Sequence, residues 1–217
     1  IVVSASETDT AGNVGTSNLS LNAIDTTTPS ALAITTADAT SNNLSQTISG
    51  TGEVGSTITV YDGATVVGTA VVNANGNWAT AVTLSGQGQH TLTATSTDAA
   101  GNTTASTANG TATSQDVVIT IDTTAPVVNL VRVADGQNSL YDSGFTATTS
   151  ATVTITVDGV ALTGSALANA FTISAPANGV VTYTANAGAF TGGEVIVVSA
   201  SETDTAGNVG TSNLSLN

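Results

Sequence analysis

Carboxylates are the only abundant side chains in this protein that could carry chemistry. The 217 residues include 15 Asp and Glu, a single Arg, one His and no Cys, which gives a formal net charge of −14. A nucleophilic active site needs a base and a group that orients it, and one His cannot supply such a site, so we predict no enzyme. The lack of His and Cys clusters argues against zinc. Hard oxygen donors favour Ca²⁺ instead.

The same charge balance limits the partners. A basic surface for nucleic acid is absent, and an anionic membrane would repel the chain. No apolar run has the length of a membrane-spanning helix. We therefore predict that the chain does not bind nucleic acid, does not insert into a membrane and has no small-molecule substrate.

A long exact repeat organises the sequence. The 22 residues IVVSASETDTAGNVGTSNLSLN fill residues 1–22 and recur unchanged at 196–217, an offset of 196 − 1 = 195. Such a match predicts a window cut from an array of near-identical units. Residues 1–22 are then the tail (the F–G strands) of a preceding repeat. Neighbouring identical repeats in the same chain are the predicted partners.

Short strands dominate the pattern. Apolar residues alternate with Thr or Ser in segments such as STITVYDG (56–63) and ATVTITVDG (151–159), as in half-buried antiparallel strands. Turn dipeptides separate the segments: Asp62-Gly63, Asn75-Gly76, Asp158-Gly159 and Asn178-Gly179. No convincing helix is predicted, and the helix-tolerant stretch 164–171 could be a turn. Trp78 is expected to anchor a core, and His90 to be a strand residue with a satisfied hydrogen bond.

Two matching linkers divide the chain. IDTTTP (24–29) and IDTTAP (121–126) place Asp25 and Asp122 at a spacing of 122 − 25 = 97 residues. Each interval holds one acidic turn, STDAAGN or SETDTAGN. Domains of about 100 residues with about seven short strands predict an all-β chain of tandem immunoglobulin-like antiparallel β-sandwiches. The predicted domains are 23–121 and 122–217, beside the terminal strand fragment 1–22.

One segment carries a family resemblance. The stretch ISGTGEVGSTITVYDG…STDAAGN, followed by VVITIDTTAP, resembles the bacterial Ig-like repeats of giant type I-secreted adhesins of the RTX and biofilm type. The resemblance covers 25–122 closely and is looser from 123 to 217. It implies an extender module that projects a ligand-binding tip from the bacterial cell surface, often stiffened by calcium. The glycine-rich calcium-binding nonapeptides of such adhesins are absent.

The acidic residues are predicted to gather at one end of each sandwich. Asp25 lies in the entering linker, Glu53 in the B–C loop and Asp98 in the F–G turn, and an Ig-like fold brings these loops together. Unpaired carboxylates at close range call for a cation, so we predict Ca²⁺ there.

The second sandwich offers a related set. Asp122 matches Asp25, Asp204 matches Asp98, and Glu202 stands where the first sandwich has Ser96. Glu202 is predicted to replace the charge that Glu53 supplies in the first sandwich. In the terminal fragment, Glu7 and Asp9 are expected to form an incomplete site.

Further acidic residues have two readings. Asp62 and Asp158, in matching Asp-Gly turns, could complete a Ca²⁺ site across the domain junction, with Asp38 as a further candidate, or could be turn residues only. Asp98 and Asp204 could likewise hydrogen-bond their own turns. We take Asp135 and Asp142 as turn residues, although they also form a ligand-spaced pair.

The function predicted from these features is structural: a spacer of end-to-end β-sandwiches, rigidified by Ca²⁺ at the junctions between domains. The alternative is an Ig-like adhesion module that binds a glycan or a protein. Aromatic residues make up 3% of the chain, and the predicted loops are short, so the alternative is the weaker reading.

Overall fold

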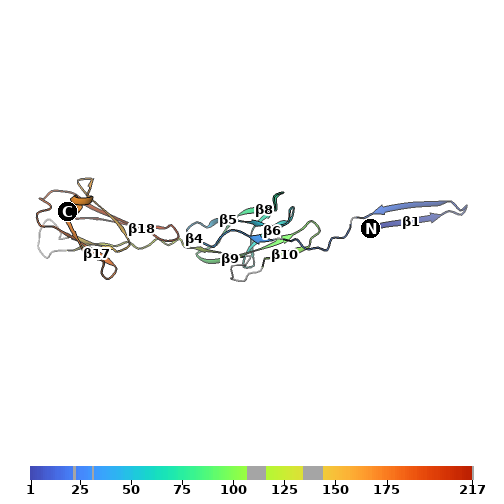
Figure 1. Cartoon of the computed structure of the whole chain (residues 1–217), viewed down its shortest axis with the longest axis horizontal. Coiled ribbons are helices and arrows are strands. Elements are labelled where there is room, and N and C mark those ends of the chain that lie inside the picture. The colour runs from blue at the N-terminus through green and yellow to red at the C-terminus, as the bar shows by residue number, and fades with distance from the viewer. Residues whose placement is uncertain (22, 31, 107–115, 134–143, 217) are drawn as a thin grey trace. The chain divides into compact units, whose positions relative to one another are not determined.

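The computed structural model describes residues 1–21, 23–30, 32–106, 116–133 and 144–216 (Figure 1). The chain divides into two compact units, Ile1–Ala39 with Leu44–Ile119 and Thr40–Asn43 with Thr120–Asn217. Each contains antiparallel sheets built from short strands, which confirms the all-β prediction. No helix among the described residues has the length and apolar character needed to span a membrane.

The first unit begins with a hairpin. Strands β1 (Val2–Thr8) and β2 (Val14–Ser20) pair antiparallel, with Val3 opposite Leu19. Every residue of both strands is exposed. The hairpin is therefore held by its own ladder and by its turn.

Two further sheets follow it. The three-stranded sheet has the order β3 (Ala33–Ile34), β5 (Ser45–Thr51), β8 (Asn77–Thr83). The larger sheet has the order β4 (Ala39–Ser41), β11 (Val117–Ile121), β9 (Gly88–Thr97), β6 (Thr57–Asp62), β7 (Thr65–Val71), with β10 (Thr103–Ala105) also on β9. Alternate residues of β6 and β9 are buried, as the period of two requires.

Trp78 on β8 anchors the core between these sheets. Its side chain is buried, and its indole Nε1–H donates to the Thr51 carbonyl oxygen at 3.0 Å. A buried Trp needs such a partner for its N–H. The predicted role of Trp78 is confirmed.

The second unit pairs two four-stranded sheets. One has the order β12 (Leu130–Val133), β13 (Gly144–Thr148), β17 (Val180–Ala185), β16 (Phe171–Ile173), and the other β15 (Val160–Ala161), β14 (Thr152–Val157), β18 (Ile196–Thr203), β19 (Val209–Ser215). Their core contains Phe145, Ile155, Phe171 and Val198. The Phe145 ring stacks on Tyr183, with centroids 4.5 Å apart.

A short helix corrects one prediction. Residues Gly164–Ala170 form α1, where the sequence suggested no convincing helix. Its N-cap residue Thr163 makes no side-chain cap hydrogen bond, and the helix has no acidic residue in its first turn and no basic residue in its last turn, so the charge signals for helix ends are missing. Its Ala170 is buried and its Leu167 packs against the core, and such tertiary contacts, rather than propensity, stabilise a helix this short.

Two kinds of turn follow the predicted dipeptides. Asp158 and Gly159, with φ of 51° and 81°, join β14 to β15 in a hairpin, as left-handed Asp-Gly pairs do. The Asn75-Gly76 turn instead connects β7 and β8, which lie in different sheets. A turn dipeptide specifies a reversal of direction, but the choice of partner strand depends on packing.

Candidate cation site

Asp98 closes the turn between β9 and β10 with its own side chain. Its Oδ1 accepts the backbone N–H groups of Ala100 at 2.8 Å and Asn102 at 2.9 Å, and its Oδ2 accepts the Asn102 side-chain amide at 2.8 Å. These hydrogen bonds, the Asn102 amide first, lower the pKa of Asp98 below its ordinary value. The hydrogen-bonded reading of this turn is correct, and these hydrogen bonds favour the charged form of the carboxylate.

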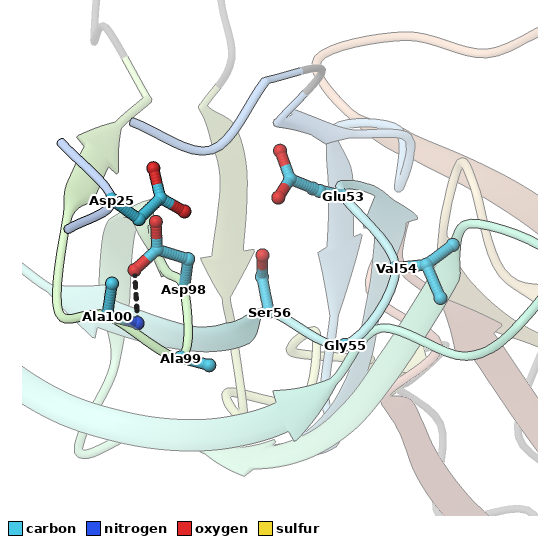
Figure 2. A pocket seen from close by; sticks show the side chains of 8 residues that line it. All are labelled: Asp25, Glu53, Val54, Gly55, Ser56, Asp98, Ala99 and Ala100. Carbon is cyan, nitrogen blue, oxygen red and sulfur yellow. Dashed lines mark hydrogen bonds between the residues drawn. The ribbon is translucent and has the colours of Figure 1, made fainter. Parts of the chain in front are cut away.

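Asn102 also fixes the linker that enters the sandwich. Its Nδ2 donates to the Asp25 carbonyl oxygen at 3.2 Å, while Asp25 Oδ1 accepts the Thr27 N–H at 2.9 Å. The linker and the F–G turn are thereby joined although they lie 77 residues apart. The result is to place the Asp25 and Asp98 carboxylates next to each other (Figure 2).

Glu53, in the loop between β5 and β6, lies across from them. Asp25, Glu53 and Asp98 line a single pocket of about 380 Å³ together with Val54, Gly55, Ser56, Ala99 and Ala100. Figure 2 shows the Glu53 carboxylate facing the other two across the pocket. Its Oε2 accepts the Ser30 N–H at 3.1 Å. Three carboxylates from distant parts of the sequence therefore line the same pocket.

The Ser56 hydroxyl completes the pocket wall. Ser56 is 2% exposed, and its Oγ has no hydrogen-bond partner in the described structure. A buried polar atom without a hydrogen-bond partner is uncommon, and a water molecule or an ion is the expected partner. The sequence argument missed Ser56, because its importance comes from its burial beside the three carboxylates.

Oxygen donors of this kind suit Ca²⁺. Carboxylates, a hydroxyl, turn carbonyls and water are the ligands that Ca²⁺ accepts in a flexible shell of 6–8. Among the described residues, however, no three His, Cys, Asp or Glu side chains lie close enough together to enclose a metal ion as they stand. The pocket therefore offers the right donor types around an open space.

The second unit repeats the turn. Asp204 Oδ1 accepts the N–H groups of Ala206 and Asn208, both at 2.9 Å, and Oδ2 accepts the Asn208 amide at 2.8 Å. Asn208 Nδ2 also donates to the Asp122 carbonyl oxygen at 2.8 Å, as Asn102 does to Asp25. Glu202 lies two residues before Asp204 on β18, opposite Gly210.

The remaining predicted ligands have protein partners. Asp62 Oδ2 lies 2.6 Å from His90 Nδ1, which confirms His90 as a strand residue with a satisfied hydrogen bond. Asp158 Oδ1 accepts the Val195 N–H and Asp38 Oδ1 the Val118 N–H, each at 2.8 Å. All three tie a turn or strand end to a neighbouring strand. Asp135 and Asp142 lie outside the described residues.

The asparagine that ends the turn is the feature that sequence reasoning overlooked. The turn NANGN (73–77) has the same spacing with Asn in the place of Asp. Its Asn73 Oδ1 accepts the Asn75 and Asn77 N–H groups at 2.9 and 3.1 Å. A comparison of the two turns in the sequence distinguishes two roles. The first residue, Asp98 or Asn73, closes the turn, whereas the last residue of the acidic turn, Asn102, holds the linker.

A family model matches part of the first sandwich. Residues 27–116 are similar to the bacterial Ig domain. No curated protein matches the chain. The matched range includes Glu53 and Asp98, whereas Asp25 lies two residues before it.

Solved adhesin structures resemble the whole chain. One is a Ca²⁺-stabilised adhesin that helps an Antarctic bacterium reach out and bind ice, 22% identical with a TM-score of 0.51, covering 100% of this chain and 55% of that one. Another is a 1.5-MDa bacterial ice-binding adhesin, 21% identical with a TM-score of 0.45, covering 100% and 72%. A tetra-tandem repeat from the extending region of a large adhesion protein is 24% identical with a TM-score of 0.33, covering 100% and 56%.

The first of these likenesses shows the fold. Together with the match to the bacterial Ig domain, it confirms the predicted Ig-like sandwich architecture. The chain spans about half the length of that adhesin. The bacterial Ig domain is not a known class of enzyme.

Proposed function

We propose that this chain is an extender segment of a large bacterial surface adhesin and that Ca²⁺ in the Asp25–Glu53–Asp98 pocket stiffens it. The observation that carries the proposal is the convergence of three carboxylates from the linker, the B–C loop and the F–G turn on one pocket. The adhesins with similar structures support the extender role. In this role the chain lies outside the cell, at its surface, between neighbouring repeats.

Charge gives the pocket its need for a cation. The chain has no Lys and one Arg to set against its 15 acidic residues, and hydrogen bonds hold the pKa of Asp98 below its ordinary value. Three carboxylates around one open space repel one another unless a cation enters. Bound Ca²⁺ would neutralise them and join the linker to both loops.

The donor set is specific enough to name. Asp25, Glu53 and Asp98 would supply carboxylate oxygens, and the Ser56 hydroxyl would gain the partner that it lacks. Water and turn carbonyls would complete a Ca²⁺ shell. In the second unit, Asp122, Glu202 and Asp204 are proposed to act in the same way. Asp62 and Asp158 stay predicted ligands, and to serve they would exchange the partners described above.

The experiment compares the folded chain with Ca²⁺ and with a chelator, by thermal melting and by small-angle scattering. Ca²⁺ is expected to raise the melting temperature and to narrow the distribution of particle lengths, because it restrains the linker. An unchanged melting temperature together with an unchanged length distribution would refute the proposal.

A matched variant separates the cation from the fold. Asp98→Asn keeps a side-chain oxygen for the two turn N–H groups, as Asn73 does in its own turn, but removes the charge and the Oδ2 acceptor of the Asn102 amide. We expect the variant to fold and to bind Ca²⁺ at least about tenfold more weakly in a calorimetric titration, since ligand charge sets the affinity of such sites. Full calcium affinity in a folded Asp98→Asn chain would exclude Asp98 as a ligand.

A further inference from the structure

Two buried serines of the first sandwich have hydroxyl groups without a protein partner. Ser56 and Ser96 are 2% and 0% exposed, and neither Oγ atom makes a hydrogen bond within the described part of the chain. Ser56 belongs to the wall of the cation pocket, and Figure 2 shows its side chain pointing into that pocket. Ser96 lies on β9, outside the set of residues that line the pocket. A buried hydroxyl destabilises a fold unless a new partner replaces the water that it has lost.

The strand register places the two serines on the same face of the larger sheet. Ile58 on β6 lies opposite Ser96, and residues directly opposite in an antiparallel pair point to the same side. Ser56 precedes Ile58 by two residues, and the Val72 N–H donates to its carbonyl oxygen at 2.9 Å, so the ladder continues to Ser56. The two serines are therefore diagonal neighbours about 7 Å apart. One water molecule can span that separation.

The linker covers this end of the sandwich. Thr104 on β10 lies opposite Ser96 on the other side of β9, and its Oγ1 donates to the Pro29 carbonyl oxygen at 2.7 Å. Pro29 is buried, and the bonds described above also hold the linker at Asp25 and Ser30. The linker therefore shields Ser96 from solvent.

The second sandwich holds its own linker closer to the sheet. Its Pro126 corresponds to Pro29 of the first linker. Gly210 corresponds to Thr104, and a Cβ at Gly210 would fall within the van der Waals radius of the Pro126 carbonyl oxygen. In the first sandwich the matching carbonyl is bound by the end of the Thr104 side chain instead. Thr104 thus acts as a spacer that holds the linker away from the strand beside Ser96.

We propose that Ser56 and Ser96 bind one enclosed water molecule beneath the linker. The water accepts the hydrogen of each hydroxyl and donates to the Pro29 carbonyl oxygen, which has a second lone pair beside its bond from Thr104. Three hydrogen bonds are typical of a buried water. Because Ser56 gives its hydrogen to the water, its oxygen lone pairs remain for the pocket cation. Only this link to the cation rests on the proposed function.

The direction of one effect distinguishes a bound water from an unpaired hydroxyl. In the full chain with chelator, Ser96→Ala should lower the melting temperature by about 4 °C or more, since hydrogen bonds are lost. Removal of an unpaired hydroxyl would leave the melting temperature unchanged or raise it, and that result would overturn the proposal. The fluorescence of Trp78, the single Trp, follows the first sandwich alone. The control is Thr97→Val, which removes a hydroxyl from the opposite face of β9 and should match the parent.

A double-mutant cycle tests whether one water joins the two serines. Ser56→Ala and Ser96→Ala should not be additive, because the first substitution already releases the shared water. The second substitution should then have less than about half of its effect in the parent chain. Additive shifts would overturn the proposal, since separate waters or unpaired hydroxyls respond independently. A high-resolution crystal structure of the parent should show a water within hydrogen-bonding distance of both Oγ atoms.

Calcium separates failure of this inference from failure of the proposed function. Ser96→Ala should bind Ca²⁺ about three- to tenfold more weakly in a calorimetric titration, which corresponds to the loss of one hydrogen bond. An unchanged affinity would overturn the link between the water and the cation. A parent chain that binds no Ca²⁺ would refute the proposed function, and the cycle in chelator would still decide whether the water is bound.

Discussion

The two hairpins of identical sequence differ in burial and not in pairing. In residues 196–216 the inward side chains are in a core, whereas in residues 1–21 both strands are exposed throughout. The register, the turn and the hydrogen bonds of the aspartate are the same. The comparison teaches that this hairpin is encoded locally and that its stability contribution depends on the surroundings.

The largest expected difference comes from a core leucine. Leu216→Ala should destabilise the second unit by about 2–5 kcal/mol, as truncation of a buried Leu does, while Leu21→Ala should change the free energy of unfolding by less than about 0.5 kcal/mol. Chemical denaturation monitored at each unit measures both. Equal effects would mean that residues 1–21 are buried in solution.

A smaller difference is expected at the turn asparagine. Asn208 holds both Asp204 and the Asp122 carbonyl, whereas Asn13 holds Asp9 within its own turn. Asn208→Ala should cost about 1–2 kcal/mol for the bonds lost, and Asn13→Ala should alter only the hairpin. The melting temperatures of the two variants and the parent measure this difference. A melting temperature of Asn13→Ala as low as that of Asn208→Ala would contradict the prediction.

Acid should sharpen the comparison further. The pKa values of Asp9 and Asp204 are both lowered below 3.8, chiefly by the amide of the asparagine that ends each turn. A lowered folded-state pKa stabilises the protein above the unfolded value and loses that contribution as the pH falls through the folded value. Below about pH 3.8, protonation of Asp204 should therefore loosen the second unit, and protonation of Asp9 only its own turn. Hydrogen exchange of the backbone amides of residues 196–216 and 1–21 would measure this loosening. The Asp204→Asn variant lacks the titrating carboxylate and is the control. A parent chain whose exchange is as insensitive to pH as that of Asp204→Asn would contradict the prediction.

Calcium is expected to produce the smallest difference. At the second turn, Asp204 would act with Glu202 and Asp122, whereas at the first turn Glu7 and Asp9 are the two acidic residues among those that line the neighbouring pocket. Ca²⁺ should shift the amide resonances of 204–208 at lower concentrations than those of 9–13. Identical titration curves would mean that the linker aspartate adds nothing to binding.

The sequence was a better guide to the acidic residues of the candidate site than to Ser56 and helix α1. Once an Ig-like fold was assumed, the positions of Asp25, Glu53 and Asp98 in the sequence were sufficient to predict that they lie at the same end of the sandwich, because that fold dictates which loops meet. Ser56 was not predictable, since Ser in a turn is unremarkable until burial removes its water. Helix α1 was missed for a similar reason: its stability comes from contacts of Leu167 and Ala170 with residues distant in sequence.

The repeated segment separates the two levels. By itself, its 22-residue sequence determined a hairpin register and an aspartate-closed turn, because alternating side chains and hydrogen bonds within four residues require no other part of the chain. Only the tertiary structure decided that Val198 is buried while Val3 is half exposed. Tertiary structure likewise decided that Gly210 admits no side chain while Gly15 has space. Burial and steric exclusion depend on what lies opposite, and no local sequence carries that information.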